Sequence, residues 1–150
     1  MPFQISDPIY QEFELVQTDA TYNPDGDVPT TVTIRQARQH EHANRMDQWS
    51  KFERKYSSMR PDEVKVVQEL SYEAIKMLEA RITLVESNIL DENGKKELFP
   101  SKKDENGKAM LDMTAKEFDM AWGYLPPDVA AEIHRKILEV NPMWGGVSGE

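Results

Sequence analysis

The sequence predicts a mainly α-helical chain with a small β component, an α+β fold of about four helices in a single domain. Three observations carry this prediction. A capped pair of helical segments occupies residues 114–144, and the longest apolar periodicity runs over residues 61–86. The β-branched run Thr30–Ile34 and two copies of the turn sequence DENGK supply the short strand and a β-hairpin near residues 89–99.

The chain divides into three parts by composition. Residues 1–29 end in TYNPDGDVP, a dense turn and loop signal, so we expect there a flexible N-terminal arm that orders against a partner or against its own domain. Residues 30–144 hold the periodic segments and are expected to form one globular helical domain. Residues 145–150, GGVSGE, have the composition of a flexible tail or linker.

Composition narrows the classes of function. The absence of cysteine excludes disulfides, iron–sulfur clusters and thiolate zinc sites. A net charge of −9 repels a phosphate backbone, so nucleic acid is not an expected partner. No apolar run approaches the roughly 18 residues of a membrane-spanning helix. The N-terminus also lacks the basic-then-apolar order of a secretory signal, so we expect a cytoplasmic protein without a membrane partner.

The first half of the domain is expected to hold a strand and two helices. Thr30–Ile34 is β-branched throughout and needs the edge of a sheet to join. Residues 36–56 carry an imperfect apolar face, which predicts a half-exposed helix. A break follows at Ser57–Pro61, and Pro61 suits the first turn of the next helix, which we expect to run to Glu86 as the central core helix.

Each DENGK segment predicts a turn. Asn-Gly can supply the two positive-φ positions of a type I′ hairpin turn, so Ile89-Leu90 is expected to pair with Leu98-Phe99 across the first copy. A calcium loop is the alternative, because Asp and Asn offer oxygen ligands. Its spacing does not fit, since Gly94 is the fourth residue from Asp91 and an EF-hand needs glycine at the sixth position.

The closing segment has the most explicit signals. Thr114 and Glu117 stand at capping-box spacing, Gly123 suits a left-handed helix end, and Pro127 suits the first turn of a second helix that ends at Asn141. The residues expected to pack the core of this closing module are Phe118, Trp122, Leu125, Ile133 and Ile137.

No catalytic, metal or cofactor site is expected. On a helix, His40 and His42 point about 200° apart and cannot share a metal. His134 is expected to face solvent or cap a helix, because no nucleophile or phosphate-binding motif accompanies it. A role in binding another protein is therefore favoured over an enzyme.

Large side chains at the edge of the predicted core are candidates for partner contacts. Trp144 follows the last helix and precedes a glycine-rich tail, so we expect it to be partly exposed while Trp122 is buried. Met143 lies beside it. Trp49 and Phe52 lie on the half-exposed helix. These four residues are the predicted partner-binding set.

Three segments resemble tail assembly chaperones of long-tailed bacteriophages. Thr31–Glu41 is similar to their strand-then-helix entry, and Arg81–Phe99 to their helix-to-hairpin segment. Glu117–Trp144 is similar to their closing part, with an aromatic-Trp pair, a Leu-Pro-Pro turn and an Asn-Pro-x-Trp end. The likeness covers about two-thirds of the chain in patches; residues 57–79 and those before Thr30 have no counterpart in it.

The resemblance implies a chaperone that binds the tape measure protein, keeps its long helices soluble and helps recruit tail-tube subunits. It also implies a place in the host cell cytoplasm and absence from the mature virion. In many such phages a ribosomal frameshift adds a second domain to some copies, for which residues 145–150 would be the linker. A frameshifted longer form and self-association are therefore further expected partners.

Rival functions remain open at the level of sequence. The main alternative is a structural virion protein, either a head–tail connector or a tail completion subunit, which would stay in the finished particle. An enzyme or metalloprotein built on the histidines and carboxylates is a further alternative, followed by a regulatory or nucleic-acid-binding module.

Overall fold

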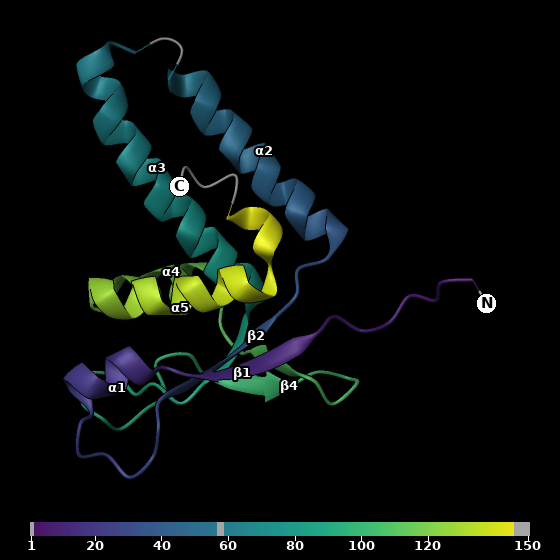
Figure 1. Ribbon diagram of the computed structural model, residues 1–150, viewed down its shortest axis with the longest axis vertical. Coiled ribbons are helices and arrows are strands. Elements are labelled where there is room, and N and C mark those ends of the chain that lie inside the picture. The colour runs from purple at the N-terminus through teal and green to yellow at the C-terminus, as the bar shows by residue number, and fades with distance from the viewer. Residues whose placement is uncertain (1, 57–58, 146–150) are drawn as a thin grey trace.

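The computed structural model describes residues 2–56 and 59–145 of the chain. In chain order the elements are β1 (Tyr10–Glu14), α1 (Val16–Tyr22), β2 (Thr31–Arg35), α2 (Gln39–Tyr56), α3 (Pro61–Thr83), β3 (Leu84–Ser87), β4 (Ser101–Lys103), β5 (Ala109–Leu111), α4 (Ala115–Gly123), α5 (Pro127–Val140) and the 3-10 turn η1 (Pro142–Trp144). The predicted mainly helical α+β fold is confirmed. Figure 1 shows a hairpin of α2 and α3 rising from a body that contains α1, α4, α5 and the strands.

The main sheet has three antiparallel strands in the order β1-β2-β3. The predicted strand at Thr30–Ile34 is confirmed as β2, whose Val32 and Ile34 face the core. Its neighbour β1 lies in the expected N-terminal arm, so this part of the arm is ordered against its own domain. Tyr10–Tyr22 pairs and packs with the domain because β2 needs a partner on that edge.

The two DENGK segments are turns, but not of the predicted type. Asn93 keeps a negative φ while Gly94 has a φ of 67°, so the turn is not type I′. The Asp91 carboxylate accepts from the backbone N–H groups of Asn93 and Lys95, which stabilises a type I turn followed by a left-handed glycine. Around this first copy the pairing is short. It consists of the bridge Leu90–Glu97 and a bond from the Leu98 N–H to the Ile89 carbonyl oxygen over 2.8 Å, so the predicted pairing is confirmed in part. The regular hairpin is β4–β5 around the second copy.

Most of the predicted helix ends agree with the structure, although α2 begins at Gln39, three residues later than expected. Thr114 and Glu117 form the predicted capping box, and α5 begins at Pro127. Gly123 does not take the predicted left-handed conformation; α4 ends with Tyr124 in a right-handed one. The predicted core helix ends at Thr83, three residues early, because Leu84–Ser87 pairs with β2 as β3.

The core lies between the sheet and α4 and α5, and the base of α3 completes it. Its buried members are Leu15, Val32, Ile34, Ala80, Leu84, Phe99, Phe118, Ala121, Trp122, Val129, Ile133, Ile137 and Trp144. The residues predicted to pack the closing module occur here, with Leu125 partly buried against the cluster. Phe118 joins two other rings, with centroid distances of 5.4 Å to Phe99 and 6.1 Å to Trp122.

A buried polar cluster joins the hairpin to the body. Arg45 of α2 and Glu79 of α3 are fully buried, and Arg45 Nε donates to Glu79 Oε2 over 2.7 Å. His134 of α5 lies 2.7 Å from the other carboxylate oxygen. Arg45 also donates to the Trp144 carbonyl oxygen over 3.2 Å, with its guanidinium 5.4 Å from the centroid of the indole ring. Four elements therefore meet at one carboxylate and one guanidinium.

Two predictions about this region are wrong. Trp144 is 1% exposed, not partly exposed, because η1 turns the indole inward, where its Nε1–H donates to His42 Nδ1 over 2.9 Å. His134 is buried against Glu79, not exposed. Two other expectations, the break at Ser57–Ser58 and the flexible tail from residue 146 onward, lie outside the described residues.

Replacing Glu79 tests the polar cluster. Glu79→Gln leaves the buried Arg45 guanidinium without its counter-charge, so we expect a loss of about 3–5 kcal/mol in the free energy of unfolding. Urea unfolding followed by circular dichroism measures it. Glu86→Gln, an exposed change on β3, is the control, with an expected effect within about 0.5 kcal/mol.

The double variant Arg45→Met with Glu79→Gln is expected to lose less than the sum of the two single variants, because it removes both charges. A cost for Glu79→Gln no larger than that for Glu86→Gln would contradict the assigned role of the cluster.

Candidate functional site

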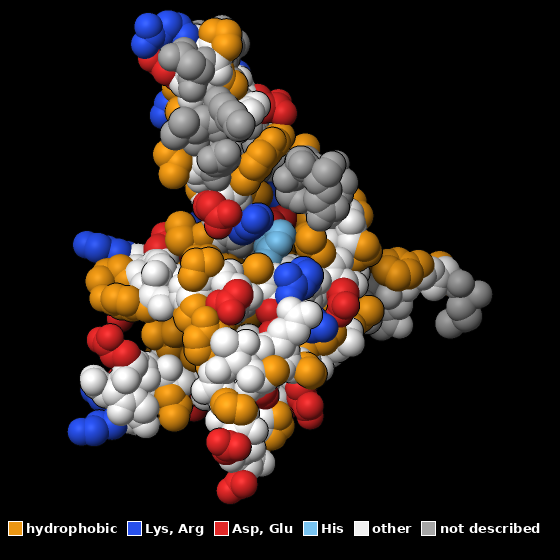
Figure 2. All heavy atoms as spheres, turned by 60° about the vertical axis from the view of Figure 1, so that its left-hand side comes forward, with side chains coloured by type: hydrophobic (Ala, Val, Ile, Leu, Met, Phe, Trp, Pro, Cys, Tyr) orange, Lys and Arg blue, Asp and Glu red, His pale blue; other side chains and the backbone are white. Residues whose placement is uncertain are grey.

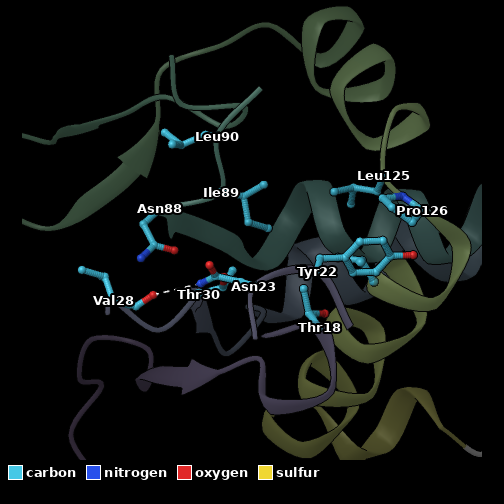
Figure 3. A pocket seen from close by; sticks show the side chains of 11 residues that line it. Thr18, Tyr22, Asn23, Val28, Thr30, Asn88, Ile89, Leu90, Leu125 and Pro126 are labelled. Carbon is cyan, nitrogen blue, oxygen red and sulfur yellow. Dashed lines mark hydrogen bonds between the residues drawn. The ribbon is translucent and has the colours of Figure 1, made fainter. Parts of the chain in front are cut away.

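An apolar pocket of about 570 Å³ lies on the body of the described part of the molecule. It lies where α1, the loop after it, the segment after β3 and the α4–α5 turn meet. Its lining residues are Thr18, Tyr22, Asn23, Val28, Thr30, Asn88, Ile89, Leu90, Leu125, Pro126 and Val129. Figure 3 shows Tyr22, Ile89 and Leu125 around the same space, although they come from three distant parts of the chain.

The rim of the pocket carries exposed apolar side chains. Tyr22 is 53% exposed, Val28 67% and Leu90 52%. The inner wall is formed by Val129 of α5, which is buried, and by Leu125 and Ile89, which are partly buried. In Figure 2, which brings the α1 side of the molecule forward, hydrophobic side chains gather on the body below the hairpin. An apolar partner can therefore reach the pocket without a large rearrangement.

The polar groups around the pocket are already hydrogen-bonded within the protein. Asn88 Oδ1 accepts from the Thr31 backbone N–H over 2.8 Å, and its Nδ2 donates to the Pro29 carbonyl over 2.9 Å. The Thr18 hydroxyl donates to Glu132 over 2.7 Å. A polar metabolite would gain few new hydrogen bonds here, whereas an apolar side chain would gain burial.

Helix α1, one wall of the pocket, is held by α5. Its N-cap residue, Leu15, has no capping side chain. The buried Glu132 carboxylate takes that role from another helix and accepts from the backbone N–H groups of Gln17 and Thr18 over 3.0 and 2.8 Å. At the other end of α1, the Tyr22 hydroxyl donates to Asp128 over 2.9 Å, and this bond raises the pKa of the phenol.

A second wall is the loop between α1 and β2, which Asp19 anchors. Its carboxylate accepts from the Thr30 backbone N–H over 2.9 Å and from the Thr30 hydroxyl over 2.6 Å. Burial alone would raise the pKa of Asp19, but these bonds and one from Asn23 outweigh it and hold the pKa below its ordinary value of 3.8. The ionised carboxylate therefore fixes the loop that carries Val28.

The predicted partner-binding residues do not line this pocket. Met143 is 69% exposed and lines a separate hollow of about 200 Å³ beside the buried Trp144. Trp49 stacks on Tyr72 of α3, with 5.3 Å between ring centroids, and Phe52 lines a small hollow between α2 and α3. Both are half-buried inside the hairpin.

Sequence reasoning did not find the pocket. Tyr22 and Val28 lay in the presumed arm, and Ile89 and Leu90 in the presumed hairpin. Its one sequence signal is the Leu-Pro-Pro turn, which places Leu125 and Pro126 on the wall.

Two of the three histidines have hydrogen-bond partners within the fold. His42 accepts from the Trp144 indole, and His134 pairs with Glu79. Over residues 2–56 and 59–145 the structure contains no group of three histidine, aspartate or glutamate side chains that could hold a metal ion. Over the same residues no helix is both long and apolar enough to cross a membrane. The arrangement offers a binding surface.

Comparison of the chain with protein-family models, with curated proteins and with solved structures found no match.

Removing the Asp19 carboxylate tests the anchored loop. The pKa of Asp19 is lower in the folded than in the unfolded chain, so the ionised carboxylate stabilises the fold at pH values above 3.8. This stabilisation is lost as the pH falls through the folded-state pKa. We expect Asp19→Asn to lower the free energy of unfolding at neutral pH. The difference in this free energy between the variant and the wild type should shrink at pH values below 3.8. Urea unfolding across this range measures both.

Asp25→Asn, an exposed change in the same loop, is the control, with an expected effect within about 0.5 kcal/mol at either pH. An Asp19→Asn deficit that does not depend on pH would contradict the assigned role of the carboxylate.

Proposed function

We propose that this chain is a tail assembly chaperone of a long-tailed phage. It binds the tape measure protein, keeps that protein soluble and helps recruit tail-tube subunits. Two independent features support the proposal. One is the sequence resemblance of Thr31–Glu41, Arg81–Phe99 and Glu117–Trp144 to such chaperones. The other is the apolar pocket, which is the single structural observation that carries the proposal, because a chaperone for amphipathic helices needs such a surface.

Two of the resembling segments meet at the pocket. The Leu-Pro-Pro turn of the closing segment contributes Leu125 and Pro126, and the helix-to-hairpin segment contributes Asn88, Ile89 and Leu90. An amphipathic helix presents apolar side chains at positions i and i+4 on one face. One or two such side chains can enter a pocket of about 570 Å³ while the rim residues Tyr22 and Val28 cover the rest of that face.

The charge of the chain fits a soluble binding protein. A net charge of −9 favours approach by helices with basic or polar outer faces. Under this proposal the protein acts by binding, without catalysis or a cofactor. It works in the host cell cytoplasm and leaves the tail before the virion is complete.

The projecting hairpin offers a secondary contact region. Figure 1 shows α2 and α3 extending well beyond the body. Leu70 on α3 is 66% exposed there, and Trp49 and Phe52 lie half-buried between the two helices. We keep these two residues and Met143 as secondary client contacts. Trp144 is no longer part of this set, because its side chain is buried.

A co-expression experiment tests the proposal. The chain is expressed with the long helical protein that the proposal places directly downstream in the genome, and the soluble client is measured. We expect the wild type to keep the client soluble. Leu90→Glu puts a charge at the pocket rim and removes apolar burial of about 1.5–3 kcal/mol, so binding should weaken by about tenfold or more.

Met120→Glu is the matched control, because Met120 on α4 is 57% exposed, close to the 52% of Leu90, and lies outside the pocket. It should retain client binding. Equal activity of both variants would remove the pocket from the proposal, and a wild-type chain that leaves the client insoluble would contradict the chaperone function itself.

Purified mature virions separate the proposal from its main alternative. A chaperone should be absent from them. A stoichiometric band of this chain would instead identify a head–tail connector or tail completion subunit.

A further inference from the structure

The N-terminal segment Pro2–Ile9 is a second apolar feature without a partner in the described chain. Figure 1 shows it leaving the body on the side opposite α1. Phe3 is 90% exposed, Ile5 80% and Ile9 62%. In extended chain, residues two apart lie on the same side, so Phe3 and Ile5 present one apolar face.

The base of this segment is fixed, whereas its outer part is not. The Gln36 backbone N–H donates to the Ile9 carbonyl oxygen over 2.8 Å, and Asp7 and Pro8 line a shallow hollow beside Arg35 and Lys108. Beyond that point, Phe3–Ser6 makes no hydrogen bond to any other described residue. We call Pro2–Ser6 the free arm. It is held out from the body and carries no charged side chain.

The free arm and the pocket lie at opposite ends of β1. The arm precedes Tyr10, whereas the pocket begins at Thr18, beyond the far end of the strand. Residues 3–9 span at most about 23 Å when extended. To reach the pocket of its own copy, this segment would have to fold back along the five residues of β1. That path uses about 17 Å of the available length before α1 is reached. The pocket of the same copy is therefore poorly placed to receive Phe3.

We propose that Phe3 and Ile5 of one copy dock in the apolar pocket of a second copy. Each copy carries both an extended apolar segment and an open apolar pocket at the opposite end, which is the arrangement of a head-to-tail contact. The two side chains enter a space of about 570 Å³ lined by Ile89, Leu125 and Val129. Because the free arm is uncharged, docking buries no ionised group.

Electrostatics gives the contact a characteristic salt dependence. Two copies, each with a net charge of −9, repel one another, and added salt screens that repulsion while it leaves apolar burial intact. Association should therefore strengthen with ionic strength. A contact based on ion pairs between copies would weaken instead.

Sedimentation equilibrium of the full chain tests the inference without any client. From about 10 μM to about 1 mM, where small interfaces associate, the wild type should show a mass that rises with concentration. Phe3→Glu with Ile5→Glu removes the arm contact, and Leu90→Glu blocks the pocket. Each variant alone should associate at least tenfold more weakly, while Met120→Glu should match the wild type.

Mixing decides between a head-to-tail contact and any other dimer. The arm variant keeps its pocket and the Leu90→Glu variant keeps its arm, so an equimolar mixture should form a 1:1 complex that neither variant forms with itself. Val28→Glu, at a 67% exposed rim position in a loop, replaces Leu90→Glu if the latter fails to fold by circular dichroism. A wild type that stays monomeric, or a mixture without the 1:1 complex, would overturn the inference.

A labelled peptide with the sequence PFQISDPI provides a direct measurement. Its fluorescence anisotropy should rise with added arm variant and should not rise with Leu90→Glu, and a peptide with serine at both apolar positions should not bind. Binding that is unchanged by Leu90→Glu would place the arm elsewhere and overturn the inference. The chaperone proposal would survive that result, because client solubility is measured separately.

Discussion

The buried pairing of Arg45 with Glu79 is the constraint on which the arrangement of the helices depends. Each ion loses several kcal/mol of hydration on burial, so the pair is tolerated only when further hydrogen bonds surround it. These come from His134 on α5 and from the Trp144 carbonyl oxygen on η1. A shift of any one of these elements by a few ångströms would break at least one hydrogen bond of the buried pair, so the cluster fixes how the hairpin, α5 and η1 fit together.

The same constraint reaches the pocket through α5. His134 and Glu132 are two residues apart on this helix, so their side chains point about 200° apart, with Ile133 directed into the core between them. One side joins Glu79 of α3, and the other caps α1 at Gln17 and Thr18. Helix α5 therefore connects the base of the hairpin to α1, which forms one wall of the pocket.

Some local signals could be read from the sequence, whereas the long-range ones could not. The capping box at Thr114 and the proline at the start of α5 act within a few residues, so spacing alone predicts them. Strand β3 was hidden because Leu84 and Val85 continue the apolar spacing of α3. The burial of Trp144 depends on Arg45 and His42, about a hundred positions earlier, and the pocket depends on three loops that only the fold brings together.

The size of the pocket sets the strength of any one contact. Two buried apolar side chains contribute roughly 3–6 kcal/mol, which offsets only the lower part of the roughly 4–15 kcal/mol cost of bringing two molecules together. A single copy would therefore hold a helix, or a neighbouring arm, weakly and release it readily. A long client offers many sites in series, and its apolar side chains would compete with the arm of a neighbouring copy for the same pocket. Weak contacts that add up along a long client would keep the client covered, while each copy could still be displaced singly. The proposed chaperone function requires both properties, because tube subunits would replace the copies in turn.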